Sequence, residues 1–157
     1  MSRPATLNQR AKLPAATFAL LNHYTYLCAI PARVRIGTAQ IVADIADVAA
    51  ITLPTDTAEA FAAYLRKTQN YDPPVIVTIH PAGTTTATLL TTPIPTHLHN
   101  DHATATILRK CQASMSEPEG KVLLPAPSDP ARRWLRNAPT SRLRPTPESV
   151  VDYLRQF

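Results

Sequence analysis

Three histidines and one aspartate stand within six residues of this chain and have the spacing of metal ligands. His97, His99, Asp101 and His102 form the pattern H-x-H-x-D-H. Neutral imidazoles and a carboxylate that converge on Zn²⁺ lower the pKa of a bound water to about 7, which supplies a nucleophile for hydrolysis. These four residues are therefore the candidate metal ligands, and zinc is the cofactor that they would hold.

The pattern resembles the signature of the metallo-β-lactamase fold, which implies a zinc-dependent hydrolase. That family draws further ligands from well downstream, whereas no histidine follows His102 here. Pro93 and Pro95 also stand where the family has an apolar strand. A single zinc on His97, His99 and His102 is one alternative. The other is a solvated histidine-rich loop in which Asp101 caps a helix.

A second group of residues has the chemistry to bind phosphate. Five arginines follow Asp129, and no acid lies among them: Arg132, Arg133, Arg136, Arg142 and Arg144. With Trp134 in their midst they could grip phosphates while the indole stacks on a base. If Trp134 belongs to the core instead, the arginines remain free on the outer face. The net charge of +5 and the pI of about 9.6 favour an anionic partner, with nucleic acid first.

The other reactive side chains point to no activity. Cys28 and Cys111 form no metal or redox motif, and we expect two reduced thiols in a cytoplasmic protein. Three glycines cannot build a phosphate-binding loop. No apolar run approaches the roughly 18 residues that span a bilayer, so we expect no membrane partner.

A hairpin over residues 75–92 is the element on which the rest of the predicted fold is arranged. Val75 to Ile79 is a β-forming run, His80-Pro81-Ala82-Gly83 suits a type I turn closed by a left-handed glycine, and a Thr- and Leu-rich run follows. Alternation places Val75, Val77 and Ile79 on one face, and Ile76, Thr78 and His80 on the other. We expect this hairpin at the centre of a small sheet.

Helices and short strands surround the hairpin in the sequence. The clearest helix begins near Thr55, where Ala58, Phe61, Ala62 and Leu65 form one apolar face. In a helix from Pro14 to Tyr26 we expect Phe18, Leu21 and Leu27 to face inward. Further helices are predicted over 101–113 and 146–154, and strands at 34–36, 39–43, 49–53, 121–124 and 133–135.

These elements predict the fold class. Strands and helices are interspersed, so we expect an α+β fold with one small mixed or antiparallel sheet, a central hairpin and three to four flanking helices. Residues 1–12 are polar and basic and are predicted to form a flexible arm. Residues 13–157 are predicted to form a single domain.

The order of these segments carries a family likeness. A strand that ends in proline (AAITLP), a helix, P-x-V-I-V with its hairpin, then G-x-V-x-L-P-x-P and R-W-L follow one another from about residue 35 to 157. This order resembles short actinobacterial proteins that are similar to the N-terminal domain of bifunctional DNA primase–polymerases. Gly120, Pro125, Pro127 and Trp134 are the individual residues that match.

The resemblance implies a scaffold that has lost its catalytic metal site. Competent members hold metal ions with a D-x-D pair on a strand, whereas residues 49–53 here carry no acid and Asp44 and Asp47 have a different spacing. His80 stands near the position of that family's phosphate-contacting histidine, although Thr78 replaces a serine.

Three hypotheses follow from these patterns. The first is a non-catalytic protein that uses the five arginines to bind nucleic acid or a nucleic-acid-processing protein. The second is a metal-dependent hydrolase or zinc-binding protein. The third is a protein-binding module.

Overall fold

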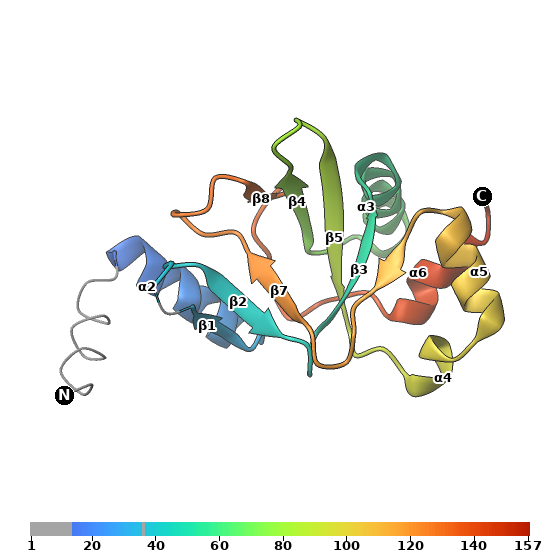
Figure 1. Cartoon of the computed structure of the whole chain (residues 1–157), viewed down its shortest axis with the longest axis horizontal. Coiled ribbons are helices and arrows are strands. Elements are labelled where there is room, and N and C mark those ends of the chain that lie inside the picture. The colour runs from blue at the N-terminus through green and yellow to red at the C-terminus, as the bar shows by residue number, and fades with distance from the viewer. Residues whose placement is uncertain (1–13, 36) are drawn as a thin grey trace.

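Two antiparallel sheets, with helices packed against them, make up the computed structural model of this chain (Figure 1). The structure describes residues 14–35 and 37–157, so the predicted arm over residues 1–12 lies outside it. The α+β class and the antiparallel pairing are confirmed. The strands divide into two sheets where the sequence predicted one, because β1, β2 and β7 pair only with one another among the described strands.

The larger sheet has five strands, and the predicted hairpin lies in its centre. Its order is β6 (Ser114–Met115), β3 (Ala49–Pro54), β5 (Thr85–Thr91), β4 (Val75–Ile79) and β8 (Arg132–Trp134). The β4–β5 hairpin runs in register from Val75 opposite Leu89 to Ile79 opposite Thr85. Gly83 has a φ of +88°, and its N–H donates to the His80 carbonyl at 2.8 Å, as the turn requires.

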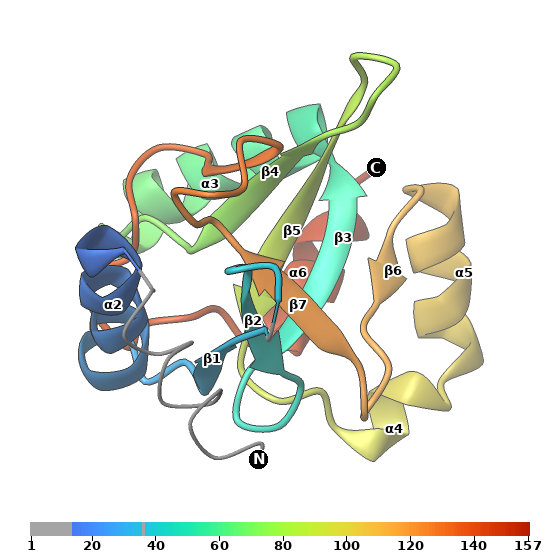
Figure 2. The ribbon, with the colours of Figure 1, turned by 60° about the vertical axis from the view of Figure 1, so that its left-hand side comes forward.

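One face of the larger sheet is covered by helices. Helix α3 (Thr55–Gln69) and helix α6 (Pro147–Leu154) lie behind it in Figure 2, and helix α5 (His102–Lys110) adds Leu108 to the same core. The predicted apolar face of α3 is confirmed, with Ala58, Phe61, Ala62 and Leu65 all buried. The sheet contributes the side chains that alternate onto this face: Ile51, Leu53, Val75, Ala87 and Leu89.

The opposite face is covered over part of its length by the smaller sheet and the first helix. The smaller sheet has the order β1 (Ala32–Val34), β2 (Ile41–Asp44) and β7 (Lys121–Leu124). Helix α2 (Ala15–Asn22) continues directly into a π-helical turn, η1 (His23–Leu27). Both sheets contribute to this second core, for example through Ile41 and Leu124 on one side and Ile76 and Leu90 on the other.

The inward face of the first helix differs from the prediction. Thr17, Tyr24 and Cys28 are buried and Leu21 packs against the core, but Phe18 and Leu27 face outward, 36% and 46% exposed. The prediction assumed α-helical spacing to Tyr26. The inward side chains nevertheless recur at i, i+4, i+7 and i+11 from Thr17. The inward face therefore passes through Thr17 rather than Phe18, and Leu27 lies beside it.

The segment between the hairpin and β6 contains two helices. A four-residue helix, α4 (Thr96–His99), occupies part of the predicted loop, and α5 begins at His102, after Asp101. None of the helices in the described part of the chain is both long and apolar enough to span a bilayer.

Candidate functional site

A groove of about 390 Å³ opens on the face of the larger sheet that points away from α3 and α6. Its floor contains Thr52, Thr78 and Thr88, which alternate with the buried side chains of the helix-covered face. Residues 114–117 and residues 120–123, which include most of β7, form its walls. The floor therefore belongs to one sheet, while one wall belongs to the other.

The strand register places hydroxyl groups in two neighbouring rows on the face of the sheet that carries this floor. In the first row Thr52 lies opposite Ser114 on β6 and opposite Thr88 on β5. In the second row Thr78 lies opposite Thr86 on β5 and opposite Arg132 on β8. Side chains of paired residues project from the same face of a sheet. Hydroxyls from four strands and one guanidinium thus share this face.

Arg132 is held in position by a buried carboxylate. Its Nη1 lies 2.7 Å from Oδ2 of Asp129, whose side chain is 8% exposed, while the Arg132 side chain is 21% exposed. A guanidinium has five N–H donors in one plane. A carboxylate bonded to Nη1 therefore orients the whole group and leaves other N–H donors without a partner from that carboxylate. Arg132 lines the groove with the remaining donors available to an anion.

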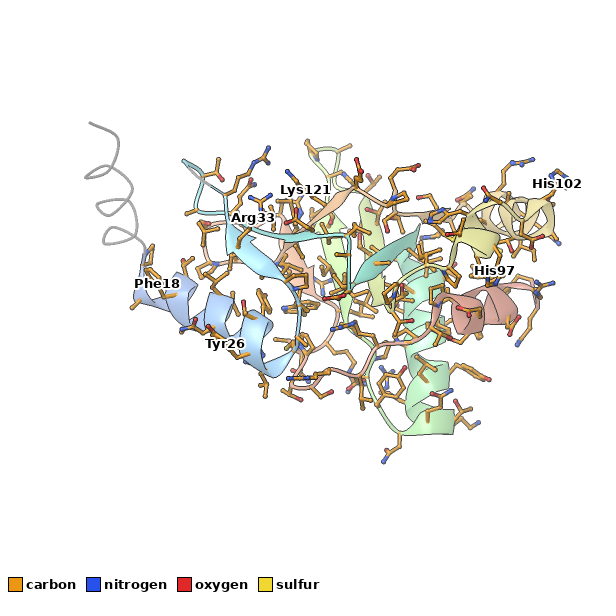
Figure 3. All side chains as sticks on the ribbon, turned by 90° about the horizontal axis from the view of Figure 1, so that it is seen from below. Phe18, Tyr26, Arg33, His97, His102 and Lys121 are labelled. Atoms are coloured by element: carbon orange, nitrogen blue, oxygen red, sulfur yellow. The ribbon has the colours of Figure 1, made fainter. Side chains whose placement is uncertain are left out.

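The wall formed by β7 contains peptide groups that point to a free edge, and Lys121 is among its lining residues. The Ile45 N–H donates to the Gly120 carbonyl at 2.9 Å, and the alternation of an antiparallel ladder then turns the Lys121 and Leu123 peptide groups toward the free edge of β7. The Lys121 side chain shares a face with Asp44, its partner across the ladder. The hydrogen bond from Arg33 lowers the pKa of Asp44, and the charge of Lys121 adds to this effect. Figure 3 labels Arg33 and Lys121.

The five predicted arginines do not share one surface. Arg132 lines the groove, whereas Arg133 is exposed on the opposite face of β8. Arg136 lines a small pocket beside the Arg66–Asp72 ion pair, and Arg142 is exposed. Arg144 is half-buried.

The half-buried Arg144 contacts the end of the first helix. Its Nη1 donates to the Cys28 carbonyl at 2.8 Å and its Nη2 to the Ala29 carbonyl at 3.4 Å. Burial lowers the pKa of its guanidinium. Cys28 Sγ and His23 Nε2 both contact the Pro139 carbonyl, at 3.1 and 2.6 Å, so the same arginine-rich segment is tied to η1. These side chains join two parts of the chain.

The histidine segment does not assemble a metal site in the structure. His97 and His102, labelled in Figure 3, are both exposed, and His99 is half-buried. Asp101 caps α5: its Oδ2 accepts from the Thr104 N–H at 3.1 Å and from the Thr104 hydroxyl at 2.6 Å. Across residues 14–35 and 37–157, no three His, Cys, Asp or Glu side chains are placed to hold a metal ion. Zinc binding here remains a prediction.

Most of the groove was not identified from the sequence. Arg132 was a predicted phosphate ligand, but Thr52, Thr88 and Ser114 were not candidates. Period-two alternation in β4 already put Thr78 and Ile76 on one face, which was the available signal. The sequence did not show that β3, β5 and β6 bring further hydroxyls into the same rows, because that depends on pairing between distant strands.

Comparisons of the chain with protein-family models, with curated proteins and with solved structures found no match. The groove is therefore the basis for the function proposed below.

Proposed function

We propose that this chain is a non-catalytic nucleic-acid-associated protein that holds a backbone phosphate in the groove. The observation that carries the proposal is Arg132, fixed by Asp129 at 2.7 Å beside two rows of hydroxyls. An oriented guanidinium binds phosphate through two parallel N–H···O bonds, which makes it a stronger anion site than a mobile surface arginine.

The size and lining of the groove suit one unit of a nucleic-acid chain. Its volume of about 390 Å³ falls within the range of about 300–1,000 Å³ that is usual for ligand sites. Hydroxyls such as those of Thr52 and Thr88 both donate and accept hydrogen bonds, so they suit phosphate oxygens and sugar hydroxyls alike. The exposed Arg133, Arg136 and Arg142 would attract the flanking phosphates over a longer range.

The composition of the groove supports a binding role rather than catalysis. Glu117 is the one acid among its lining residues in the described chain, whereas nucleotidyl transfer on paired metal ions uses several carboxylates. The likeness to primase–polymerase domains points in the same direction, since the matching strand β3 lacks the acids of that family.

The proposal predicts that binding weakens steeply as salt rises, because phosphate contacts release condensed counterions. Fluorescence anisotropy with a labelled single-stranded DNA, and with an RNA of the same sequence, measures affinity across a salt series. In Arg132→Gln we expect binding to weaken by about tenfold or more, and the salt slope to fall by about one contact.

A matched control distinguishes a loss of binding at the groove from a loss caused by the lower net charge. Arg109→Gln removes the same charge from α5, which packs in the helix-covered core, and we expect it to leave the affinity nearly unchanged. Thr88→Val tests the floor without any change of charge, and several-fold weaker binding is expected. Equal losses in Arg132→Gln and Arg109→Gln would contradict the groove. Salt-independent binding, or no binding at low salt, would contradict the nucleic-acid partner and favour a protein-binding module.

A further inference from the structure

The first helix lies in a long stretch of this chain that carries no charge. From Pro14 to Ala32 there is no Asp, Glu, Lys or Arg, although the chain holds 16 basic and 11 acidic residues. A helix that is apolar on all sides normally has all its sides buried. Here α2 and η1 pack one side on the core and leave the other side without cover among the described residues.

The uncovered side forms a continuous stripe. Its large members are Phe18, Tyr26 and Leu27, which are 36%, 75% and 46% exposed. Ala15, Ala19 and Asn22 are exposed between and beside them at helical spacing. We call these six residues the outer stripe. Figures 1 and 3 show that α2 lies at the end of the molecule away from α5, with Phe18 and Tyr26 toward its two ends.

The two aromatic members of the outer stripe lie at equal sequence distances from Asn22. Phe18 stands four residues before Asn22, and Tyr26 stands four residues after it. If a second helix of the same sequence packs antiparallel on a two-fold axis through Asn22, each Phe18 meets the partner's Tyr26, and Ala19 meets the partner's Thr25. Both aromatic pairs form at once, because a two-fold interface repeats every contact.

We propose that α2 and η1 form the interface of a homodimer in which the outer stripes of two copies pack antiparallel around Asn22. An amide on the axis can donate to and accept from its own copy, so Asn22 would be satisfied and would fix the register, as a single buried Asn does in coiled coils. The absence of charge matters because two copies with a net charge of +5 repel one another, and a contact through the outer stripe places no like charges opposite one another.

The length of the outer stripe limits the area that a dimer can bury, and so its affinity. The eight residues of α2 and the five of η1 make a helix about 20 Å long. Two such helices bury less than about 1,200 Å² in total, at the low end of specific interfaces. We therefore expect a reversible dimer whose population depends on protein concentration.

Sedimentation velocity on the full chain tests the dimer. Between about 5 and about 500 µM the weight-average mass should rise from monomer toward dimer. Asn22→Lys places two ammonium groups opposite one another on the axis and should hold the chain monomeric over the whole range. Ala60→Lys, at an exposed position of α3, adds the same charge and should dimerise like the original chain. Circular dichroism checks that both variants are folded.

Cross-linking gives a second test that does not depend on a disruptive variant. Asn22→Cys brings two thiols together on the proposed axis, where oxidised glutathione should convert the dimer into a covalent one. Ala60→Cys controls for random collision. A covalent dimer that forms no faster in Asn22→Cys than in Ala60→Cys would overturn the antiparallel register.

Three other outcomes would overturn the dimer itself. They are a monomer at every concentration, an Asn22→Lys variant that dimerises normally, and a monomer that co-sediments with anionic phospholipid vesicles through the outer stripe. Addition of salt separates this inference from the proposed function. Nucleic-acid binding should weaken, whereas an uncharged apolar interface should persist.

Discussion

Tyr24 is the residue through which the two sheets are hydrogen-bonded to each other. It is fully buried, and its hydroxyl donates to the Pro125 carbonyl at 2.7 Å, just after β7. The same oxygen accepts from Nε1 of Trp134 at 3.1 Å, on β8 of the larger sheet. The two rings pack edge to face with centroids 5.8 Å apart. Burial raises the pKa of Tyr24 to about 12.

This pKa makes stability depend on pH in the alkaline range. The unfolded phenol titrates near 10 and the folded one near 12, so the neutral form stabilises the fold fully below pH 10. That stability is lost as the pH rises through 12, and amounts to about 3 kcal/mol. Urea unfolding between about pH 9 and pH 12 should show this loss, and Tyr24→Phe should lack Tyr24's share of it.

Tyr26→Phe is the matched control, because Tyr26 is 75% exposed. It should follow the original chain at every pH. Tyr24→Phe should also be less stable at neutral pH, by about 1–3 kcal/mol, since it leaves the Pro125 carbonyl and the Trp134 N–H without their partner. An unchanged alkaline profile in Tyr24→Phe would contradict the assignment.

At the residue scale, the sequence indicated which side chains have suitable chemistry, but not which residues they contact. The sequence singled out Arg132 as the first of five arginines with no acid among them. Its carboxylate partner, Asp129, lies three residues earlier and is buried. The ion pair forms because the turn before β8 brings the two side chains together. That turn also decides that Arg132 faces the groove and Arg133 faces away, since a shift of one residue would exchange them.

At the scale of single elements, periodicity correctly predicted the features that local sequence determines, namely the hairpin and the apolar face of α3. The hairpin over 75–92 and the apolar face of α3 are confirmed because turn residues and helical spacing specify them. The inward face of the first helix was wrong at Phe18 and Leu27. The inward face passes instead through the polar Thr17 and through Tyr24 and Cys28, whose tertiary hydrogen bonds no local signal predicts.

Helix α5 depends on its cap, Asp101. Hydrogen bonds from the Thr104 hydroxyl and N–H lower the pKa of this carboxyl. The lowered pKa means that the cap contributes stability above the unfolded pKa and loses it as the pH falls through the folded one. Asp101→Ala should therefore destabilise the chain at neutral pH, and the difference from the original chain should shrink at acidic pH in thermal unfolding.

Asp101→Asn is the conservative control for this cap. It keeps a side-chain acceptor for the Thr104 N–H, so it should be more stable than Asp101→Ala at neutral pH. A difference that stays constant down to acidic pH would contradict a role for the ionised carboxyl. Zinc content of the purified chain, with His99→Ala beside it, tests the metal prediction separately.

For the molecule as a whole, the number of sheets could not be predicted. The sequence shows which segments favour strands but not that β2 pairs with β7, about eighty residues later, rather than with β3. The two sheets nevertheless share one core, to which Ile41, Leu90 and Leu124 all belong. Shared burial of this kind makes the two sheets unfold together.

This shared core predicts a single cooperative transition. Trp134 is the only tryptophan, and it lies where the two sheets meet, so its fluorescence reports on their junction. Urea unfolding followed by this fluorescence and by far-ultraviolet circular dichroism should give the same midpoint. An earlier midpoint for the fluorescence would mean that the smaller sheet and α2 separate first, and would contradict the shared core.

The division of the groove between the two sheets has a mechanical consequence. A phosphate bound to Arg132 on β8 and to the free edge of β7 would bridge the sheets from outside, as Tyr24 does from within. Such a ligand binds only when β7 is docked, so its binding free energy opposes any opening of the smaller sheet. Occupancy would then slow amide hydrogen exchange in β2, which touches no part of the groove.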